Sequence, residues 1–539
     1  MKKISGLLLV GCSALALAGC GADDIASSGA SGDINIDITN PTPTPTPTPT
    51  SSTVTAATEC PGTAATGGLV LSDDGVLTTD QGTWRVCTLP ALVDVSSTLP
   101  KVSGVLYRLN GRVDVGCDGG FTAPTTGSPH TTNTAACSGK VMEADDDVTL
   151  SIEPGVIVYG DSRQNGIAWL AVNRGNKIDA EGTASAPIIF TAYENVVGTA
   201  TDSTDGLWGG IVLLGRGVIT DCDASGSWAA GTCQRDTEGA ASFAYFGGND
   251  DTYNAGTIKY VQIRYSGYAL APGAELQSLT GGGVGTGTTL DYFQSYNSSD
   301  DGSEWFGGAV NFKHYIAVNA DDDSLDLDTG VHANFQYGLL LQRSADGDAF
   351  MEIDSAGKNT ENSAEVTRRT VANIVNFSAY QPHLHSSGDN SDKAAIMLRG
   401  NSDTTFANDI FYTPENECIV MNGETPGAAT LTAYSTLIGC ADPKYIGAGT
   451  YSATDVANMF GATTNNNSDT YTVTLTNGFS DILASGTSYD ATGLSSYFDN
   501  SGYIGALSAA TDTWYQGWTC DSTTADFGSG EDCTSLPTT

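Results

Sequence analysis

Short apolar runs recur along most of this chain, separated by Gly, Asn, Asp or Pro residues. Examples are residues 149–152, 156–159, 169–172, 187–190, 208–214, 258–265, 290–293, 315–318 and 337–341. Short runs bounded by turn residues are typical of β-strands, and almost no stretch has a sustained helical period. The runs recur about every 20 to 25 residues, which is typical of the coils of a parallel β-helix. Because the repeats are irregular, a β-sandwich or a propeller is the alternative.

The N-terminus has the features of a bacterial secretory signal. Lys2 and Lys3 precede an apolar run over about residues 7–18, and small residues lead into Cys20. The stretch Leu-Ala-Gly-Cys at 17–20 resembles the lipobox of bacterial lipoproteins, which implies cleavage before Cys20 and acylation of that residue. An ordinary secretory signal with an incidental Cys20 is the alternative. The apolar run is too short to cross a bilayer of about 30 Å.

The segment after Cys20 is predicted to be a tether. Residues 20–58 are poor in large apolar side chains, so they bury too little surface to offset the entropy of ordering. Five Pro-Thr pairs at 41–50 favour an extended polyproline II spacer of roughly 30 Å. Gly21 follows the cysteine with no acidic residue beside it, which by resemblance to enterobacterial sorting indicates the outer membrane. We therefore expect an outer-membrane lipoprotein, exposed at the cell surface.

The rest of the chain, about 480 residues, is long for one compact domain and suits an elongated repeat architecture. We predict four parts: a signal peptide at 1–19, a lipid anchor and disordered linker at 20–58, a disulfide-rich N-terminal cap at 59–146, and a β-helix with a C-terminal cap at 147–539. A cap is expected because the open end of a β-helix is an exposed sheet edge.

The charge balance excludes one class of partner. The chain has 62 acidic and 22 basic residues, and loss of Lys2 and Lys3 with the signal leaves a net charge of −42. Such a field repels nucleic acid and anionic lipid and favours cations. We expect no nucleic-acid partner, a membrane contact through the lipid anchor only, and a glycan or an envelope protein as the ligand.

Ten cysteines remain beyond Cys12 and Cys20, and they suit an oxidising compartment. There is no Cys-x-x-Cys motif and no histidine at ligand spacing, so metal binding by cysteine is the weaker interpretation. Sequence alone does not fix connectivity. The favoured pairing joins neighbours: Cys60–Cys87, Cys117–Cys137, Cys222–Cys233, Cys418–Cys440 and Cys520–Cys533.

Several stretches carry a family resemblance. They are residues 152–155 (IEPG), 206–210 (GLWGG), 300–308 (DDGSEWFGG) and 321–328 (DDDSLDLD), with an ending at 503–506 (YIGA) followed by Trp514 and Trp518. The chain resembles, over about residues 145 to 520, a family of bacterial surface lipoproteins predicted to form right-handed parallel β-helices. The resemblance implies an all-β, pectate-lyase-like solenoid. It implies no particular activity, because the family has no agreed one.

Three acidic runs lie about one coil apart. They comprise Asp300, Asp301 and Glu304; then Asp321, Asp322, Asp323, Asp326 and Asp328; then Asp346, Asp348, Glu352 and Asp354. The alternation in residues 325–328 and 351–354 predicts apolar side chains inward and carboxylates outward. Stacked coils would bring these carboxylates about 4.8 Å apart, a spacing that requires cations or raised pKa values.

The acidic runs have three interpretations. In the first they form a solvated stack of turns. In the second they bind calcium, which takes six to eight oxygen ligands, through Asp300, Asp301, Glu304, Asp321, Asp323, Asp326 and Asp328. In the third, Asp301, Glu304, Asp323 and Asp326 are catalytic, because carboxylates one or two coils apart cover both glycosidase geometries. Trp305 and Phe306 lie beside the acidic residues, and Trp208 has a similar Trp-Gly-Gly setting. We favour these aromatic residues as core residues, and a sugar-stacking platform is the alternative.

No phosphate loop, nucleophile elbow or zinc-protease motif is present in the sequence. The main expectation is a surface binding or scaffold lipoprotein with calcium on its acidic face. A carbohydrate-active enzyme, such as a polysaccharide hydrolase or lyase, is the first alternative. An accessory lipoprotein of an outer-membrane transporter is the second.

Overall fold

The computed structural model divides the chain into two units, Met1–Ser51 and Ser52–Thr539. It describes residues 54–222, 225–238, 240, 242–271, 274–342, 347–355, 368–385, 394–423 and 427–537, all within the second unit. The predicted signal peptide, Cys20 and the Pro-Thr run lie outside the described residues, as does Asp346. The description below concerns the second unit alone.

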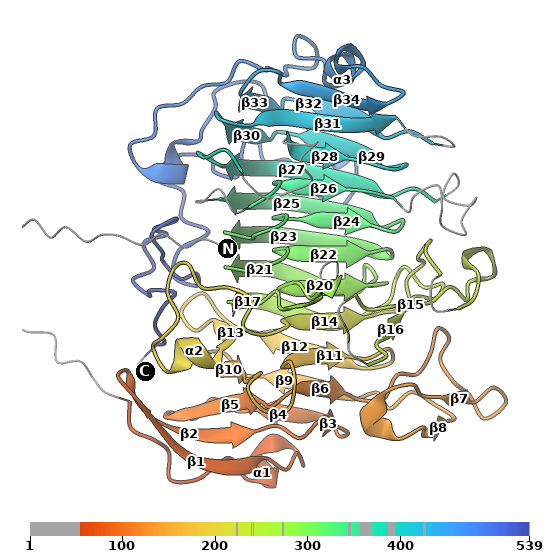
Figure 1. Cartoon of the computed structure of the whole chain (residues 1–539), viewed down its shortest axis with the longest axis vertical. Coiled ribbons are helices and arrows are strands. Elements are labelled where there is room, and N and C mark those ends of the chain that lie inside the picture. Colours follow the sequence, from red (N-terminus) through yellow and green to blue (C-terminus); the bar gives the residue numbers. More distant parts are fainter. Residues whose placement is uncertain are drawn as a thin grey trace, which may run out of the picture. The chain divides into compact units, whose positions relative to one another are not determined.

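The unit is a parallel β-helix, as the strand pattern predicts (Figure 1). One face is an eleven-stranded sheet, called sheet B here, in which every strand pairs in parallel with the next. Its strands are β3 (Leu92–Val93), β6 (Arg112–Val115), β11 (Trp169–Val172), β14 (Ile211–Leu214), β20 (Leu279–Gly282), β22 (Ser303–Phe306), β24 (Asp326–Asp328), β26 (Met351–Ile353), β28 (Ala394–Leu398), β31 (Glu417–Gly423) and β34 (Tyr445–Gly449). The starts of β20, β22, β24 and β26, at 279, 303, 326 and 351, give the predicted interval per coil.

A seventeen-stranded sheet, sheet A, forms the remaining faces. Its strands are β1 (Ser72–Thr79), β2 (Gly82–Thr88), β4 (Ser97–Leu99), β5 (Val105–Leu109), β9 (Thr149–Ile152), β10 (Ile157–Gly160), β12 (Lys177–Glu181), β13 (Ile188–Ala192), β17 (Gly256–Arg264), β21 (Thr289–Tyr296), β23 (Ala309–Val318), β25 (His332–Leu341), β27 (Val371–Tyr380), β29 (Asp403–Ala407), β30 (Ile410–Thr413), β32 (Thr430–Tyr434) and β33 (Leu437–Cys440). Strand β17 pairs with β12 through its first half and with β13 through its second, so sheet A covers two faces.

The long strands of sheet A bend at one residue each. At the bend, Tyr260, Tyr292, His314 and Tyr337 adopt left-handed φ angles of 51° to 65°. Because consecutive coils bend at the same place, these rings stack: the centroids are 4.3 Å apart for Tyr260 and Tyr292, 4.0 Å for Tyr292 and His314, and 5.1 Å for His314 and Tyr337. The outer corner of the β-helix is therefore an aromatic column.

The sequence pattern places the start of the β-helix at residue 147, but its coils begin before that residue. Strands β5 and β4 pair in parallel with β10 and β9, and β6 pairs with β11. The region predicted as a cap thus contributes coils of its own. Strand β1, antiparallel to β2, and the short helix α1 (Thr63–Thr66) lie at the N-terminal edge. Helix α3 (Ala453–Phe460) packs on β34 and β32 near the other end of the stack.

Two excursions leave the ends of sheet B strands. The first, after β6, contains the hairpin of β7 (His130–Thr131) and β8 (Val141–Met142). The second, after β14, contains β15 (Arg235–Asp236) and β16 (Tyr245–Phe246). Smaller elements are the helix α2 (Tyr193–Val196) and the pair β18 (Ala269–Ala271) and β19 (Ala274–Glu275).

No helix among the described residues has the length and hydrophobicity needed to span a bilayer.

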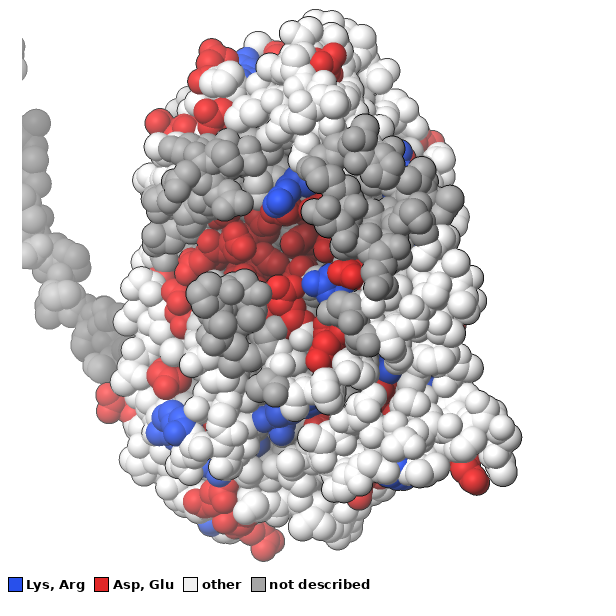
Figure 2. Space-filling model, turned by 45° about the vertical axis from the view of Figure 1, so that its right-hand side comes forward, with Lys and Arg blue, Asp and Glu red and all other residues white. Residues whose placement is uncertain are grey.

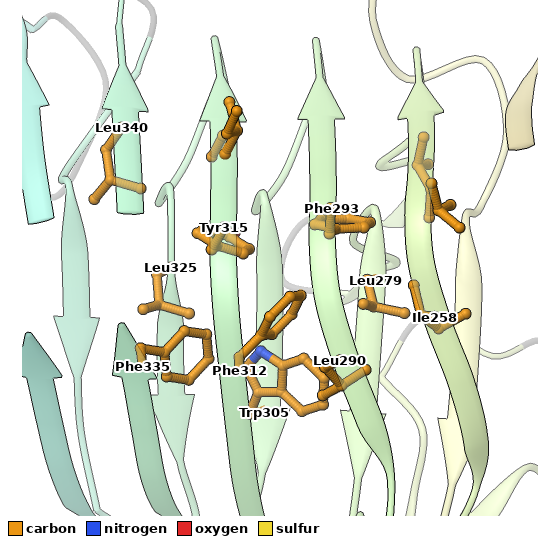
Figure 3. Packing of buried hydrophobic residues seen from close by; sticks show 14 of the residues in the cluster. Ile258, Leu279, Leu290, Phe293, Trp305, Phe312, Tyr315, Leu325, Phe335 and Leu340 are labelled. Atoms are coloured by element: carbon orange, nitrogen blue, oxygen red, sulfur yellow. The ribbon is translucent and has the colours of Figure 1, made fainter. Parts of the chain in front are cut away.

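The core fills the space between the faces, as Figure 3 shows for Trp305, Phe312, Tyr315 and Phe335. Trp305 is fully buried, its indole Nε1–H donates to Ser303 Oγ at 3.0 Å, and its ring meets Phe312 edge-on at 6.0 Å. Along β24 the predicted alternation is confirmed, because Leu325 and Leu327 are fully buried and the aspartates between and after them face outward.

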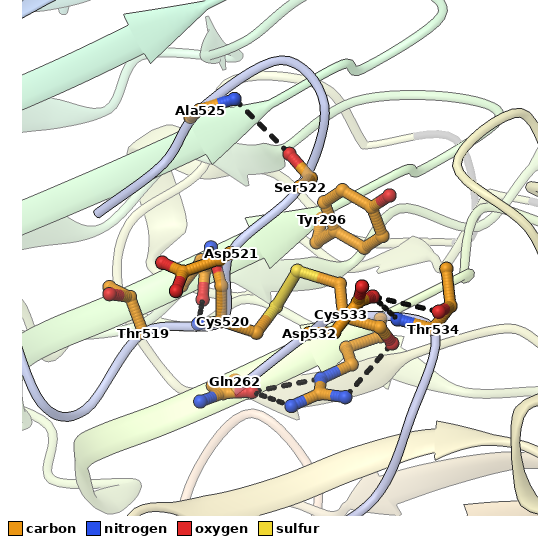
Figure 4. Close-up of a disulfide and its surroundings, with 12 residues drawn as sticks. Gln262, Tyr296, Thr519, Cys520, Asp521, Ser522, Ala525, Asp532, Cys533 and Thr534 are labelled. Carbon is orange, nitrogen blue, oxygen red and sulfur yellow. Dashed lines mark hydrogen bonds between the residues drawn. A yellow bond between two sulfur atoms is a disulfide. The ribbon is translucent and has the colours of Figure 1, made fainter. Parts of the chain in front are cut away.

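The described part of the chain contains five disulfides, and they join the neighbouring pairs favoured above. They are Cys60–Cys87, Cys117–Cys137, Cys222–Cys233, Cys418–Cys440 and Cys520–Cys533. The second and third each brace one excursion, and the last lies in the C-terminal segment beside Gln262 (Figure 4).

The C-terminal segment, residues 487–537, returns along the side of the coils. Side-chain amides and one guanidinium on the coils bind its backbone. Asn408 Nδ2 donates to Tyr489 O and Gln336 Nε2 to Asp499 O, both at 2.9 Å. Further along the segment, Asn376 donates to Tyr503 O and Gln262 donates to Trp518 O. The backbone N–H of Cys520 donates to the side chain of Gln294. The guanidinium of Arg264 donates to Cys533 O and Ser535 O. Leu536 N–H donates to Gln81 Oε1, next to the first coils, at 2.7 Å.

Candidate functional site

A ladder of carboxylates lies on the outer face of sheet B. Glu304 on β22 pairs with Asp326 on β24, and Asp326 pairs with Glu352 on β26. Neighbouring residues at the same register in a parallel sheet are about 4.8 Å apart, so three carboxylates form consecutive rungs. Asp328 and Asp354 extend the ladder two residues further along each strand. The runs align because the coil length is nearly constant here.

The turns that lead into these strands add more carboxylates. Asp323 N–H donates to Asp301 Oδ1 at 3.0 Å, and Ala349 N–H donates to Asp323 Oδ1 at 3.0 Å, so the backbone of each turn holds the aspartate of the coil before it. Asp300 accepts a hydrogen bond from Gln277 Nε2 at 3.1 Å. We call the whole set the acidic recess: Asp300, Asp301, Glu304, Asp322, Asp323, Asp326, Asp328, Glu352 and Asp354. Figure 2 shows the acidic side chains gathered in a recessed area of this face, with basic side chains at its edges.

Two arginines lie beside the outer carboxylates. Arg399, at the end of β28, forms an ion pair with Glu352 and lies 3.9 Å from Asp354. Arg235, from the second excursion, lies 3.9 Å from Asp328 and stacks over Phe306 with its guanidinium 4.8 Å from the ring centroid. These contacts place positive charge at the edges of the recess.

The inner carboxylates have no such partner. Among the described residues, Asp300, Asp301, Glu304 and Asp326 make no ion pair. Glu304 is only 7 % exposed and its carboxylate makes no hydrogen bond with any described residue. Asp326 Oδ1 is also buried without a partner. An ionised carboxylate in this position is costly unless a cation compensates it.

The burial of these groups changes their proton affinity. Burial raises the pKa of Asp300 to about 8, and neighbouring Asp322 adds to the effect. Burial also raises the pKa of Glu352 to about 7 and of Asp354 to about 8. For Asp301, Glu304, Asp323 and Asp326 the pKa lies well above the usual range, first because of burial and then because of adjacent carboxylates. At neutral pH the recess holds either protons or cations.

The recess fits a hard divalent cation. Two groups of three carboxylates, Asp300–Asp301–Asp322 and Asp301–Glu304–Asp326, each have ligand atoms within 4.8 Å of one another. Calcium binds oxygens at 2.3–2.6 Å, so oxygens on opposite sides of one ion are separated by up to about 5 Å. The all-oxygen donor set and the orphaned carboxylate of Glu304 suit calcium better than a softer metal.

The structure separates the predicted ligands. It brings together Asp300, Asp301, Glu304 and Asp326. It leaves Asp321, Asp323 and Asp328 outside both groups: Asp323 Oδ1 accepts a backbone N–H, and Asp328 lies beside Arg235. Asp322, in the same run but not among the predicted ligands, joins the first group. Period-two alternation does not hold within the turn, so the sequence could not distinguish Asp321 from Asp322.

The aromatic residues considered above are all buried. Trp208 and Trp305 are fully buried in the core between the faces, and Phe306 is 1 % exposed. Phe306 lies on the outer side of β22, where Phe246 and Arg235 of the second excursion cover it. None of the three is therefore accessible for stacking on a sugar. The two flanking arginines were not anticipated, because Arg235 comes from an excursion more than 60 residues before β22 and Arg399 from beyond β26.

Fold and site together define a parallel β-helix protein with a carboxylate-lined recess on one sheet. A family model described as a pectate-lyase-like β-helix domain matches residues 130–519. The chain belongs to this family, and the β-helix predicted from its sequence is thereby confirmed. Neither the search of curated proteins nor the search of solved structures found a match. The family and the fold support a carbohydrate-active protein or a surface protein.

Proposed function

We propose that this protein is a bacterial cell-envelope lipoprotein whose acidic recess binds calcium at the outer surface. The observation that carries the proposal is the pair of three-carboxylate groups that share Asp301. The second group includes Glu304, which is nine-tenths buried and has no protein partner among the described residues. Anchoring through Cys20 and the Pro-Thr tether would hold the β-helix away from the membrane. Asp300, Asp301, Glu304, Asp322 and Asp326 would supply the calcium ligands, and the bound calcium would offset their charge and leave coordination positions for an external oxygen ligand.

Calcium is expected to stabilise the full-length protein against heat. A ligand that binds only the folded state adds about 2.7 kcal/mol when its concentration is 100 times its Kd. We expect EDTA to lower the Tm and calcium to restore it. In the double variant Glu304→Gln/Asp326→Asn the restoration should be clearly smaller, because two of the three ligands of the Asp301–Glu304–Asp326 group are neutral. The measurement is differential scanning calorimetry with and without 1 mM CaCl2.

The matched control is Asp179→Asn, which removes an exposed carboxylate from β12 on sheet A. This variant should keep the full response to calcium. A wild-type Tm that EDTA and calcium leave unchanged would refute calcium binding at the recess.

A second candidate, a polysaccharide-degrading enzyme, is favoured by the match to the pectate-lyase-like family. The carboxylates of Asp301, Glu304 and Asp326 lie within 4.8 Å of one another, near the roughly 5 Å spacing of retaining glycosidases. A buried, protonated carboxyl group such as Glu304 is suited to act as a general acid. Asp323 is less suited, because it is 2 % exposed and bound by Ala349 N–H.

An enzyme of this kind would release reducing ends from a neutral or acidic glycan. Asp301→Asn and Glu304→Gln should each lower kcat by about 10²-fold or more, the usual contribution of a general acid or base, and Asp179→Asn should leave it unchanged. The measurement is a reducing-sugar assay on a broad polysaccharide panel. Absence of products from every substrate would leave the binding function as the proposal.

A further inference from the structure

The acidic recess contains two overlapping groups of ligands and not one. Asp300, Asp301 and Asp322 form the first and Asp301, Glu304 and Asp326 the second. The five carboxylates do not form a single group at the same 4.8 Å limit, so the arrangement offers two centres and not one. Asp301 belongs to both.

The position of Asp301 suits a bridging ligand. One of its oxygens, Oδ1, accepts a single hydrogen bond from Asp323 N–H at 3.0 Å, which fixes the orientation of the carboxylate. An ionised carboxylate has about four lone-pair sites, so this bond leaves sites for two cations. The side chain is 4 % exposed, and the turn backbone that binds it limits its freedom to turn away.

The charge count agrees with two ions. Asp300, Asp301, Glu304 and Asp326 make no ion pair with described residues, whereas Glu352, Asp354 and Asp328 lie beside Arg399 or Arg235. If these four groups and Asp322 are all ionised, the five ligands carry five negative charges. One divalent cation would neutralise two of them, and two cations would neutralise four.

The two positions also differ in access. The second group includes Glu304, at 7 % exposure, and the buried Oδ1 of Asp326. The first includes Asp322, which is exposed. An ion in the second group is enclosed by protein, whereas an ion in the first keeps positions open to water or to an external oxygen ligand.

We propose that the recess is a two-ion calcium centre in which Asp301 bridges an enclosed ion, held by Glu304 and Asp326, and an open ion, held by Asp300 and Asp322. This inference rests on the calcium binding proposed above and adds its stoichiometry, its bridging residue and the unequal access of the two ions.

The test is isothermal titration of the metal-free full-length protein with CaCl2. The wild type should bind two ions per chain. Glu304→Gln should bind one, because only the enclosed position is lost, and Asp300→Asn should bind one, because only the open position is lost. Asp301→Asn should weaken both positions by about tenfold or more, and the control Asp179→Asn should bind two.

The outcomes separate the two proposals. One ion in the wild type, or two ions that Asp301→Asn leaves at full affinity, would overturn the two-ion centre while calcium binding stands. No ion in the wild type would overturn both. Circular dichroism of each variant establishes that it is folded. The Glu304 and Asp300 variants each remove a ligand of a different ion position, so if one variant does not fold, the other still tests the number of ions bound.

Discussion

A chain that ends at residue 486 is expected to melt about 10 °C or more below the full-length protein. The missing segment contributes seven large buried side chains, and each contributes about 1.5–3 kcal/mol when removed from water. They are Phe498, Ile504, Leu507, Tyr515, Trp518, Phe527 and Leu536. Truncation also exposes the aromatic column and leaves Gln262, Gln294 and Arg264 without the backbone groups that they bind.

A single substitution tests the same contact without shortening the chain. Trp518 is fully buried and meets the rings of Tyr260 and Tyr292 edge-on, at 6.1 and 5.7 Å. Trp518→Ala should cost about 3–5 kcal/mol, the usual range for a large aromatic residue in a core. Thr513→Ala, an exposed position in the same segment, should stay within about 0.5 kcal/mol. Equal stability of truncated and full-length chains would show that the segment does not support the coils.

Trp305→Ala is expected to cost about 3–5 kcal/mol of unfolding free energy. Its indole fills the core directly behind the acidic recess and meets Phe312 at 6.0 Å and Phe335 at 6.4 Å, edge-on in both cases. Its removal leaves a large cavity between the faces. Because Trp305 and Glu304 are consecutive on β22, we expect calcium affinity to fall as well.

The measurement is urea unfolding of wild type and variant, followed by fluorescence and circular dichroism. Trp305→Phe should lose clearly less unfolding free energy than Trp305→Ala, since it keeps an aromatic ring in the core. Val76→Ala, at a residue 55 % exposed on β1, should have almost no effect. A Trp305→Ala chain as stable as the Val76→Ala chain would contradict the core described for this layer.

The sequence predicted the middle of the fold well because the information there is local. In residues 325–328 and 351–354 every second side chain is apolar, and burial follows that pattern. The disulfide pairing could also be predicted from local information, because the two cysteines of each pair are near each other in the sequence and close one turn or excursion. The repeat length placed the three acidic runs on adjacent coils, and four of the predicted calcium ligands lie together.

Two features were beyond the reach of local patterns. The first coils were predicted as a cap because they lie outside the family resemblance and because the open end of a β-helix is an exposed sheet edge. Charged residues on their strands are paired with acidic residues nearby, Arg85 with Asp73 and Arg108 with Asp74. The return of the C-terminal segment depends on contacts between residues more than 200 positions apart, such as Arg264 with Cys533. A contact of this kind produces no periodic pattern in the sequence from which it could be predicted.

The returning segment also sets an order of events during folding. Neighbouring coils can bury one another early, since adjacent rungs are one coil apart in sequence, whereas Gln81 meets Leu536 across 455 positions. Contacts of long sequence separation form late, because closing the loop between them costs entropy that earlier contacts do not repay. The side of the solenoid therefore closes last, and until it closes the protein is a row of coils with an open flank.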